Sequence, residues 1–290
     1  MKVINQYVTD KFSAYHGDCV EVMKGIPDSS VHYSIFSPPF ASLYTYSNSD
    51  RDMSNCIDDE TFMKNMEFLA KELYRATVAG RLVSFHVMNT QATLGKDGFR
   101  GIIDLRGDLI RLFQNAGFIY HSEVTIWKDP ELAAIRTKNP SLLYRNFKKD
   151  ASKVRQGLAE YLITMRKEGE DEPVTHNEDE HPRKLWANYA SPVWMDINPS
   201  DTLQRTSAKE EKDEKHLTPT NLEILGRAID LWTNPNDIVL SPFMGIGSEG
   251  FKAIDMKRRF VGIELKESYY NVALNNLKAI STKQEQETLF

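Results

Sequence analysis

Strand-like and helix-like segments alternate over most of this 290-residue chain, and no other feature limits its fold as strongly. Apolar runs typical of strands occur at 12–16, 31–36, 82–87, 118–127, 237–240 and 260–263. Helical periodicity lies between them, over about 20–26, 58–80, 105–115 and 219–232. Two further helices are expected, one from the glycine-rich turn to residue 256 and one from 267 to about 280. This order predicts an α/β fold in which a mostly parallel sheet carries helices on both faces. We expect Gly80 to end the second helix and the polar tail 281–290 to fray.

The alternation fails from about residue 130 to 215, where polar and charged residues dominate. This predicts a domain formed by 1–129 and 216–290, interrupted by an inserted recognition region with an acidic loop over 130–215. The first part of the region is basic and interleaved with aromatic residues, which favours phosphate contact, although a solvated helix face would look similar. The candidate phosphate-contacting residues are Arg136, Lys138, Arg145, Lys148, Lys149, Lys153 and Arg155.

Composition excludes several classes of protein. A net charge of −5 argues against a protein that coats nucleic acid without specificity. Cys19 and Cys56 are too few for a disulfide framework and lack metal-ligand spacing, so no metal is expected. The sequence contains no apolar run long enough to cross a bilayer and no signal-peptide pattern, which predicts a soluble protein of the cytoplasm with no membrane partner.

The tetrapeptide Ser37-Pro38-Pro39-Phe40 directly follows the strand expected at 31–36. Two consecutive prolines remove two backbone N–H donors, so the strand must stop and leave a rigid rim rich in hydrogen-bond acceptors. Ser37 adds a hydroxyl, and Phe40 offers a flat apolar face on which a planar ring can stack. Such a rim could hold an exocyclic amine, although a strand ending in a polyproline turn is the simpler interpretation.

The segment from Ser241 to Gly250 joins an expected strand to an expected helix, the position of a nucleotide-binding glycine turn. Gly245 and Gly247 would let a ligand approach the backbone closely, because neither has a Cβ. Glu264 ends the next strand, where its carboxylate can accept both hydroxyls of a ribose. The pattern indicates a nucleoside cofactor. A structural turn and the dinucleotide site of an NAD enzyme remain alternatives.

Together these segments resemble the β class of S-adenosylmethionine-dependent DNA amino-methyltransferases, which methylate cytosine N4 or adenine N6. In that family Asp, Asn or Ser precedes Pro-Pro and an aromatic residue, as Ser37 does here. The glycine turn resembles D-P-F-x-G-x-G, with Ser241 in place of the usual Asp. The catalytic motif precedes the insertion and the glycine turn follows it, which is the circularly permuted order of the β class.

Three shorter segments support the resemblance. Asp18 lies in a segment similar to G-D-x-x-E, and Glu264-Leu265 matches the start of G-x-E-x-x-x-x-Y. Residues 215–219 resemble K-H-P-T-x-x-P, with Leu217 in place of the first proline. The resemblance implies a Rossmann-like, seven-stranded, mostly parallel sheet and S-adenosylmethionine as cofactor. The implied cofactor-binding residues are Asp18, Ser37, Lys215, Thr218, Ser241, Pro242, Phe243, Gly245, Gly247, Ser248, Glu264 and Leu265.

The resemblance also implies the reaction, with Ser37, Pro38, Pro39 and Phe40 as the catalytic residues. The substrate would be double-stranded DNA with its target base flipped out, and the Ser37 side chain and the Pro38 carbonyl would accept hydrogen bonds from the amine. Neither cysteine follows a proline, which counts against a cytosine C5 methyltransferase. The implied compartment is the cytoplasm of a prokaryote, or of the host of a phage.

Serine in the first motif position favours cytosine N4 as the target, with adenine N6 as the alternative. An NAD-dependent dehydrogenase and an inactive DNA-binding module are lower alternatives. A homodimer and a separate restriction nuclease are open expectations, because the sequence contains no nuclease motif.

Overall fold

The computed structural model describes residues 2–39, 59–131, 144–153, 155–203 and 219–288. Nine strands of these ranges form the main sheet. Across the sheet they are β1 (Asn5–Val8), β2 (Phe12–His16), β11 (Arg259–Glu264), β10 (Ile238–Ser241), β3 (Val31–Phe36), β4 (Thr77–Met88), β8 (Glu160–Arg166), β7 (Ile119–Ile126) and β9 (Val193–Trp194).

The five strands from β2 to β4 are parallel to one another, and β8 is antiparallel to both of its neighbours. The predicted α/β fold with a mostly parallel sheet is therefore confirmed. The seven strands from β2 to β7 form its central part, and the short strands β1 and β9 are added at the two edges.

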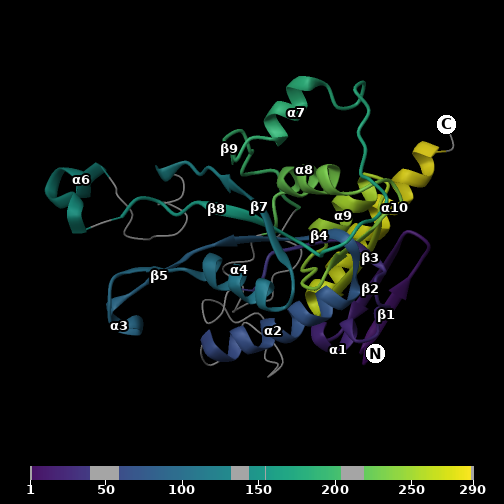
Figure 1. Cartoon of the computed structure of the whole chain (residues 1–290), viewed down its shortest axis with the longest axis horizontal. Coiled ribbons are helices and arrows are strands. Elements are labelled where there is room, and N and C mark those ends of the chain that lie inside the picture. Colours follow the sequence, from purple (N-terminus) through teal and green to yellow (C-terminus); the bar gives the residue numbers. More distant parts are fainter. Residues whose placement is uncertain (1, 40–58, 132–143, 154, 204–218, 289–290) are drawn as a thin grey trace.

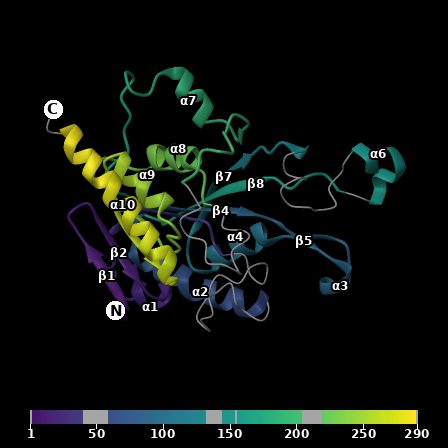
Figure 2. The same ribbon diagram turned by 180° about the vertical axis from the view of Figure 1, so that it is seen from behind.

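Helices cover both faces of the sheet (Figures 1 and 2). One face carries α1 (Cys19–Met23), α2 (Asp59–Ala76) and α4 (Leu105–Asn115), and the other carries α8 (Leu222–Trp232), α9 (Ser248–Asp255) and α10 (Glu267–Thr288). Several helices begin at a capping side chain. Asn221 accepts hydrogen bonds from the backbone N–H groups of Glu223 and Ile224 at the start of α8, at 3.0 and 3.2 Å.

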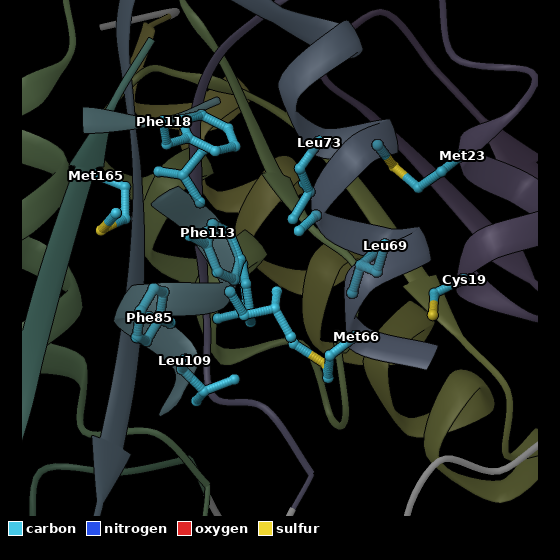
Figure 3. Packing of buried hydrophobic residues seen from close by; sticks show 14 of the residues in the cluster. Cys19, Met23, Met66, Leu69, Leu73, Phe85, Leu109, Phe113, Phe118 and Met165 are labelled. Carbon is cyan, nitrogen blue, oxygen red and sulfur yellow. The ribbon is translucent and has the colours of Figure 1, made fainter. Parts of the chain in front are cut away.

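The core beneath α2 and α4 combines aliphatic, sulfur-containing and aromatic side chains (Figure 3). Phe113 of α4 and Phe85 of β4 are fully buried, and their ring centroids lie 4.9 Å apart. Met66 and Leu69 of α2 are fully buried against the same cluster. This packing fixes β4, and therefore the polar residue that follows Phe85.

Smaller elements lie outside the central sheet. They are β5 (Thr90–Ala92), α3 (Leu94–Asp97), β6 (Gly101–Ile103), α6 (Tyr144–Asp150), the 3₁₀ turn η2 (Ala151–Lys153) and α7 (Arg183–Tyr189). The helix α6 lies apart from the helices that flank the sheet in both views (Figures 1 and 2).

Two predicted helix ends are wrong. Helix α2 ends at Ala76 rather than Gly80, because its last carbonyls accept hydrogen bonds from Ser29 and Ser30 and the chain continues as β4. Helix α10 continues to Thr288 instead of fraying from Ser281. Lys11 donates to the Ser281 carbonyl, and Gln284 donates to a carbonyl of α9.

The range predicted as an insertion also contains a sheet strand. Residues 160–166 form β8, which pairs with β4 on one side and β7 on the other. The centre of β8, from Leu162 to Met165, is buried, but it is a short apolar stretch in a charged part of the sequence. The structure therefore places this segment in the sheet, while the recognition role of residues 130–215 stays a prediction.

Candidate functional site

The sheet register brings the predicted site residues to one edge. Glu264 at the end of β11 pairs with His16 of β2, and Ser241 at the end of β10 pairs with Gly262. Ser37 directly follows β3, the strand beside β10. The register places β2 beside β11 and β10 beside β3, so these carboxyl ends meet where open α/β sheets bind ligands.

Backbone hydrogen bonds hold the glycine turn against β11. The N–H of Met244 donates to the Ile263 carbonyl at 2.8 Å, and the N–H of Gly245 donates to Glu264 Oε2 at 2.8 Å. Glu264 Oε1 accepts from the Lys266 N–H at 2.8 Å. Because a carboxylate offers about four acceptor positions, these bonds orient Glu264 and still allow it to accept ligand hydroxyls.

The two glycines of the turn meet different requirements. Gly245 has φ +55°, and a Cβ added there would face open space. Gly247 has φ +90°, and its added Cβ would lie 3.3 Å from Ala273 of α10. Only Gly245 therefore fits the prediction of close ligand approach, whereas Gly247 serves the backbone conformation and the packing of α10.

The other predicted cofactor residues lie around this turn. Asp18 caps α1 by accepting from the Glu21 N–H at 3.0 Å, and the neighbouring Gly17 N–H donates to the Glu264 carbonyl at 3.0 Å. Phe243 packs edge-on against Phe36 of β3, with centroids 5.7 Å apart. Pro242, Ser248 and Ser241 are buried, Leu265 is half-buried, and the Leu265 carbonyl lies 3.0 Å from His16 Nε2.

Ser37 connects two polar chains. Its Oγ lies 3.3 Å from His86 Nδ1 of β4 and 3.3 Å from Oγ1 of Thr220, which precedes α8. On one side, His86 Nε2 lies 3.1 Å from Glu160 Oε2 of β8. On the other side, Thr220 Oγ1 donates to Glu249 Oε1 of α9 at 3.0 Å. Pro38 is buried and Pro39 is half-buried beside Ser37.

Glu160 is paired with two basic groups. Its side chain is 18% exposed and contacts both His86 and Lys128. Burial raises the pKa of the Glu160 carboxyl, but His86 and Lys128 outweigh burial and lower it to about 2. An ionised carboxylate only accepts hydrogen bonds, so His86 Nε2 carries the hydrogen of this contact. The Nδ1 atom of a neutral His86 is then an acceptor for the Ser37 hydroxyl.

Glu249 is only 3% exposed, and within the described ranges no Lys or Arg forms an ion pair with it. Burial raises the pKa of its carboxyl to about 7, against the opposing effect of hydrogen bonds from its own backbone and from Thr220. The negative charge of Glu264 raises this pKa further.

A count of protons agrees with the raised pKa of Glu249. With His86 neutral, Ser37 donates its one hydroxyl proton to His86 Nδ1, and Thr220 donates its one to Glu249. Neither hydroxyl then has a hydrogen left to donate across the 3.3 Å contact between Ser37 and Thr220. A proton on Glu249 would complete the chain, because Thr220 could then donate to Ser37.

Sequence reasoning missed His86, Glu160, Thr220 and Glu249. His86 lies within an apolar strand, and Glu160 lies at the end of a mainly basic segment, so neither carries a local signal of a site. A charged residue beside the glycine turn was the signal that could have found Glu249.

Some predicted residues cannot be placed. Phe40, Lys215, Thr218, Arg136 and Lys138 lie outside the described residues, as do the side chains of Arg145 and Lys153. Their assigned roles stay predictions.

The described basic candidates fall into two groups. Lys148 and Lys149 are exposed in the last turn of α6, beside the exposed rings of Tyr144 and Phe147. The half-buried Arg155 instead donates to Gln91 Oε1 of β5 at 3.2 Å, and burial lowers its pKa.

Three side chains away from the sheet edge could hold a metal ion, although none was expected from the sequence. They are His176, His181 and Asp230, whose ligand atoms lie within 4.8 Å of one another. His181 Nε2 already lies 2.8 Å from Asp230 Oδ2, which explains the grouping as a histidine–carboxylate pair. Among the described helices, none is long and apolar enough to cross a membrane.

Comparison with known proteins gives consistent matches over nearly the whole chain. The model of a DNA methylase family, covering N6 and N4 enzymes, matches residues 31–275. The chain is 24% identical to the DNA adenine methyltransferase YhdJ of Escherichia coli K12, over 94% of this chain and 84% of that protein.

Two solved structures share the fold. The cytosine-N4-specific PvuII DNA methyltransferase aligns with a TM-score of 0.68 at 16% identity, over 97% of this chain and 96% of that one. A Thermus thermophilus protein complexed with S-adenosyl-L-methionine aligns with a TM-score of 0.65 at 21% identity, over 92% of this chain and 94% of that one.

Proposed function

This chain belongs to the N6/N4 family of DNA methylases, and from that premise we propose that it transfers a methyl group from S-adenosylmethionine to the N4 amine of cytosine in double-stranded DNA. Family membership makes it a DNA methyltransferase that acts on an amino nitrogen. The proposal for this site rests on one observation, the meeting of Ser37, the glycine turn and Glu264 at adjacent strand ends.

The edge formed by β2, β11 and β10 fits the cofactor. Gly245 faces open space, Glu264 can accept ribose hydroxyls, and the fully buried Ser241 Oγ has no hydrogen-bond partner among the described residues. Ser241 is therefore an acceptor suited to a donor on the ligand. When bound, S-adenosylmethionine supplies a methyl group activated by a sulfonium. The Thermus neighbour complexed with this molecule supports the choice.

Ser37 would hold the target amine. Because its hydroxyl proton is directed to His86, its remaining lone pairs can accept a hydrogen bond from the amine, together with the Pro38 carbonyl. Methylation leaves the amine nitrogen with a proton to lose. Ser37 can take this proton while passing its own to His86 Nδ1, and Glu160 stabilises the resulting imidazolium.

The choice of cytosine N4 rests on the serine at position 37, since serine is commoner there in the cytosine members of the family. The PvuII enzyme, which is cytosine-N4-specific, has the same fold. Adenine N6 is the second candidate, supported by the similarity to the adenine methyltransferase YhdJ.

We propose that α6 contacts the DNA. Lys148 and Lys149 would bind phosphates, and the exposed rings of Tyr144 and Phe147 lie on the same short helix. A base inside a duplex cannot reach Ser37, so the target would be flipped out at a cost of a few kcal/mol. Phe40 would offset about 1–3 kcal/mol of that cost by stacking. Self-association and a cognate nuclease stay predictions.

Nucleoside analysis tests the proposal. The protein is incubated with S-adenosylmethionine and unmodified DNA, and the digested nucleosides are identified by mass. We expect N4-methyldeoxycytidine, whereas N6-methyldeoxyadenosine would replace the preferred target with the second candidate. A Ser37→Ala variant that still binds the cofactor is the matched control, and it should form neither product.

A further inference from the structure

The first turn of α9 contains a buried acid whose charge no described basic residue balances. Glu249 follows the glycine turn by two residues and is 3% exposed. Its side chain accepts a hydrogen bond from the hydroxyl of Thr220, at 3.0 Å, and within the described part of the chain no basic side chain pairs with it. A buried carboxylate without a cation is costly, so its retention calls for a partner.

A second unsatisfied group lies at the end of the adjacent strand. Ser241 is fully buried, and its Oγ has no hydrogen-bond partner among the described residues. In the D-P-F-x-G-x-G turn that this segment resembles, an acid occupies the same position. Serine preserves an acceptor there but removes the negative charge.

These two observations point to one ligand group. We propose that Glu249 binds the ammonium group of S-adenosylmethionine and thereby supplies the negative charge that is missing at Ser241. The proposal rests on the proposed function, because it takes the cofactor from there. An ammonium in this site would neutralise the buried carboxylate through a charge-assisted hydrogen bond, which is strongest where water is excluded.

The same contact would connect the cofactor to Ser37. An ionised Glu249 accepts the Thr220 proton, and Thr220 lies 3.3 Å from Ser37. With Thr220 committed to Glu249, Ser37 donates to His86 and turns its lone pairs toward the substrate. Binding of the cation therefore favours the arrangement that the target amine needs. Among the described residues, the charged group that acts on the pKa of Glu249 is Glu264, which is itself an acid and cannot replace the cation.

Calorimetry with three ligands tests the proposal directly. S-adenosylmethionine carries an ammonium and a sulfonium, S-adenosylhomocysteine keeps only the ammonium, and methylthioadenosine lacks both. In the Glu249→Gln variant we expect about 10- to 100-fold weaker binding of the first two ligands and unchanged binding of methylthioadenosine. Glu267→Gln, an exposed acid in the first turn of α10, is the control and should bind all three normally.

Three outcomes would overturn the proposal. Unchanged affinity for S-adenosylmethionine would show that Glu249 does not bind its cation. Weakening of S-adenosylmethionine alone would assign Glu249 to the sulfonium, and weakening of all three ligands would indicate a structural effect. Failure of the unaltered protein to bind S-adenosylmethionine is a separate result, which would overturn the proposed function and this inference with it.

Moving the acid from position 249 to position 241 provides an independent test. Adding Ser241→Asp to Glu249→Gln returns an acid to the position where the resembling turn has one. We expect this double variant to recover most of the lost affinity for both ammonium-bearing ligands. Melting temperatures of all variants identify any that fail to fold. A folded double variant that does not recover affinity for these ligands would contradict the claim that Glu249 supplies the charge missing at Ser241.

Discussion

The half-buried Glu160 and the buried Glu249 are two carboxyls at the ends of the polar chains that meet at Ser37, and the protein treats their charges differently. Glu160 has His86 and Lys128 beside it, and the pKa of its carboxyl is lowered to about 2. Glu249 has one hydroxyl beside it, and burial raises the pKa of its carboxyl to about 7. Burial raises both values, so the basic neighbours of Glu160 account for the difference.

The difference lies in whether residues of the protein balance the charge of the carboxylate. The charge of Glu160 is balanced by the protein's own residues, so it can fix the orientation of His86 in every state of the reaction. The charge of Glu249 is not balanced by any described residue, which suits a site completed by a ligand. Variants that alter only one of the two carboxyls can therefore test this contrast.

The largest effect should come from Glu160→Gln. A neutral amide no longer requires His86 Nε2 to donate, so Nδ1 can carry the hydrogen and stop accepting from Ser37. We expect the single-turnover rate of methyl transfer to fall about 10²- to 10⁴-fold, with cofactor affinity unchanged. Equal losses of rate and cofactor affinity would instead mean that Glu160 supports the whole site.

Glu249→Gln should make the protein without cofactor more stable at alkaline pH. The pKa of its carboxyl is higher in the folded chain than in the unfolded chain, so the folded state binds more protons and stability falls as pH rises from 4.5 to about 7. Without cofactor, we expect the variant to be about 3 kcal/mol more stable than the unaltered protein near pH 8 and equally stable near pH 4. Urea unfolding at both pH values measures this. A variant that is less stable at both would show that Glu249 is already satisfied.

The fold could be predicted to a large extent because its elements carry local signals. Strands β2 and β3 begin and end at the predicted residues, and so does α4. The end of α2 could not be predicted, because it depends on Ser29 and Ser30, which are far away in the sequence. Strand β8 was missed for a related reason, since its pairing with β4 and β7 outweighs the local charge pattern.

The candidate site likewise contains a part that the sequence could predict and a part that it could not. The glycine turn and Glu264 are close in sequence, so their spacing alone indicated a shared ligand. The contacts of Ser37 with His86 and Thr220 span 49 and 183 residues, and sheet register creates them. No spacing rule in the sequence could have connected these side chains.

A smaller effect should follow Lys128→Met, which removes the lysine charge beside Glu160 and leaves His86 in place. The pKa of the Glu160 carboxyl should rise toward its ordinary value. Its stabilising effect, present above pH 4.5 and lost as pH falls toward about 2, should then be lost at a higher pH. Because Lys128 is 37% exposed, solvent screening should limit the cost at neutral pH to about 1 kcal/mol. Lys71→Met, which breaks the exposed ion pair with Glu67, is the control and should leave the loss of stability at acid pH unchanged.

An effect of similar size should come from Thr220→Val, which preserves shape and removes the hydroxyl beside Glu249. Because the Thr220 hydrogen bond lowers the pKa of Glu249, its loss should raise that pKa further and cost about 0.5–1.5 kcal/mol near pH 8. Thr220→Ser should preserve the bond and most of the stability. In the Glu249→Gln background the cost should shrink, because the bond no longer stabilises a charge, and a double-mutant cycle measures this coupling. Zero coupling would mean that Thr220 and Glu249 act independently, so Glu249 would have no link through Thr220 to Ser37.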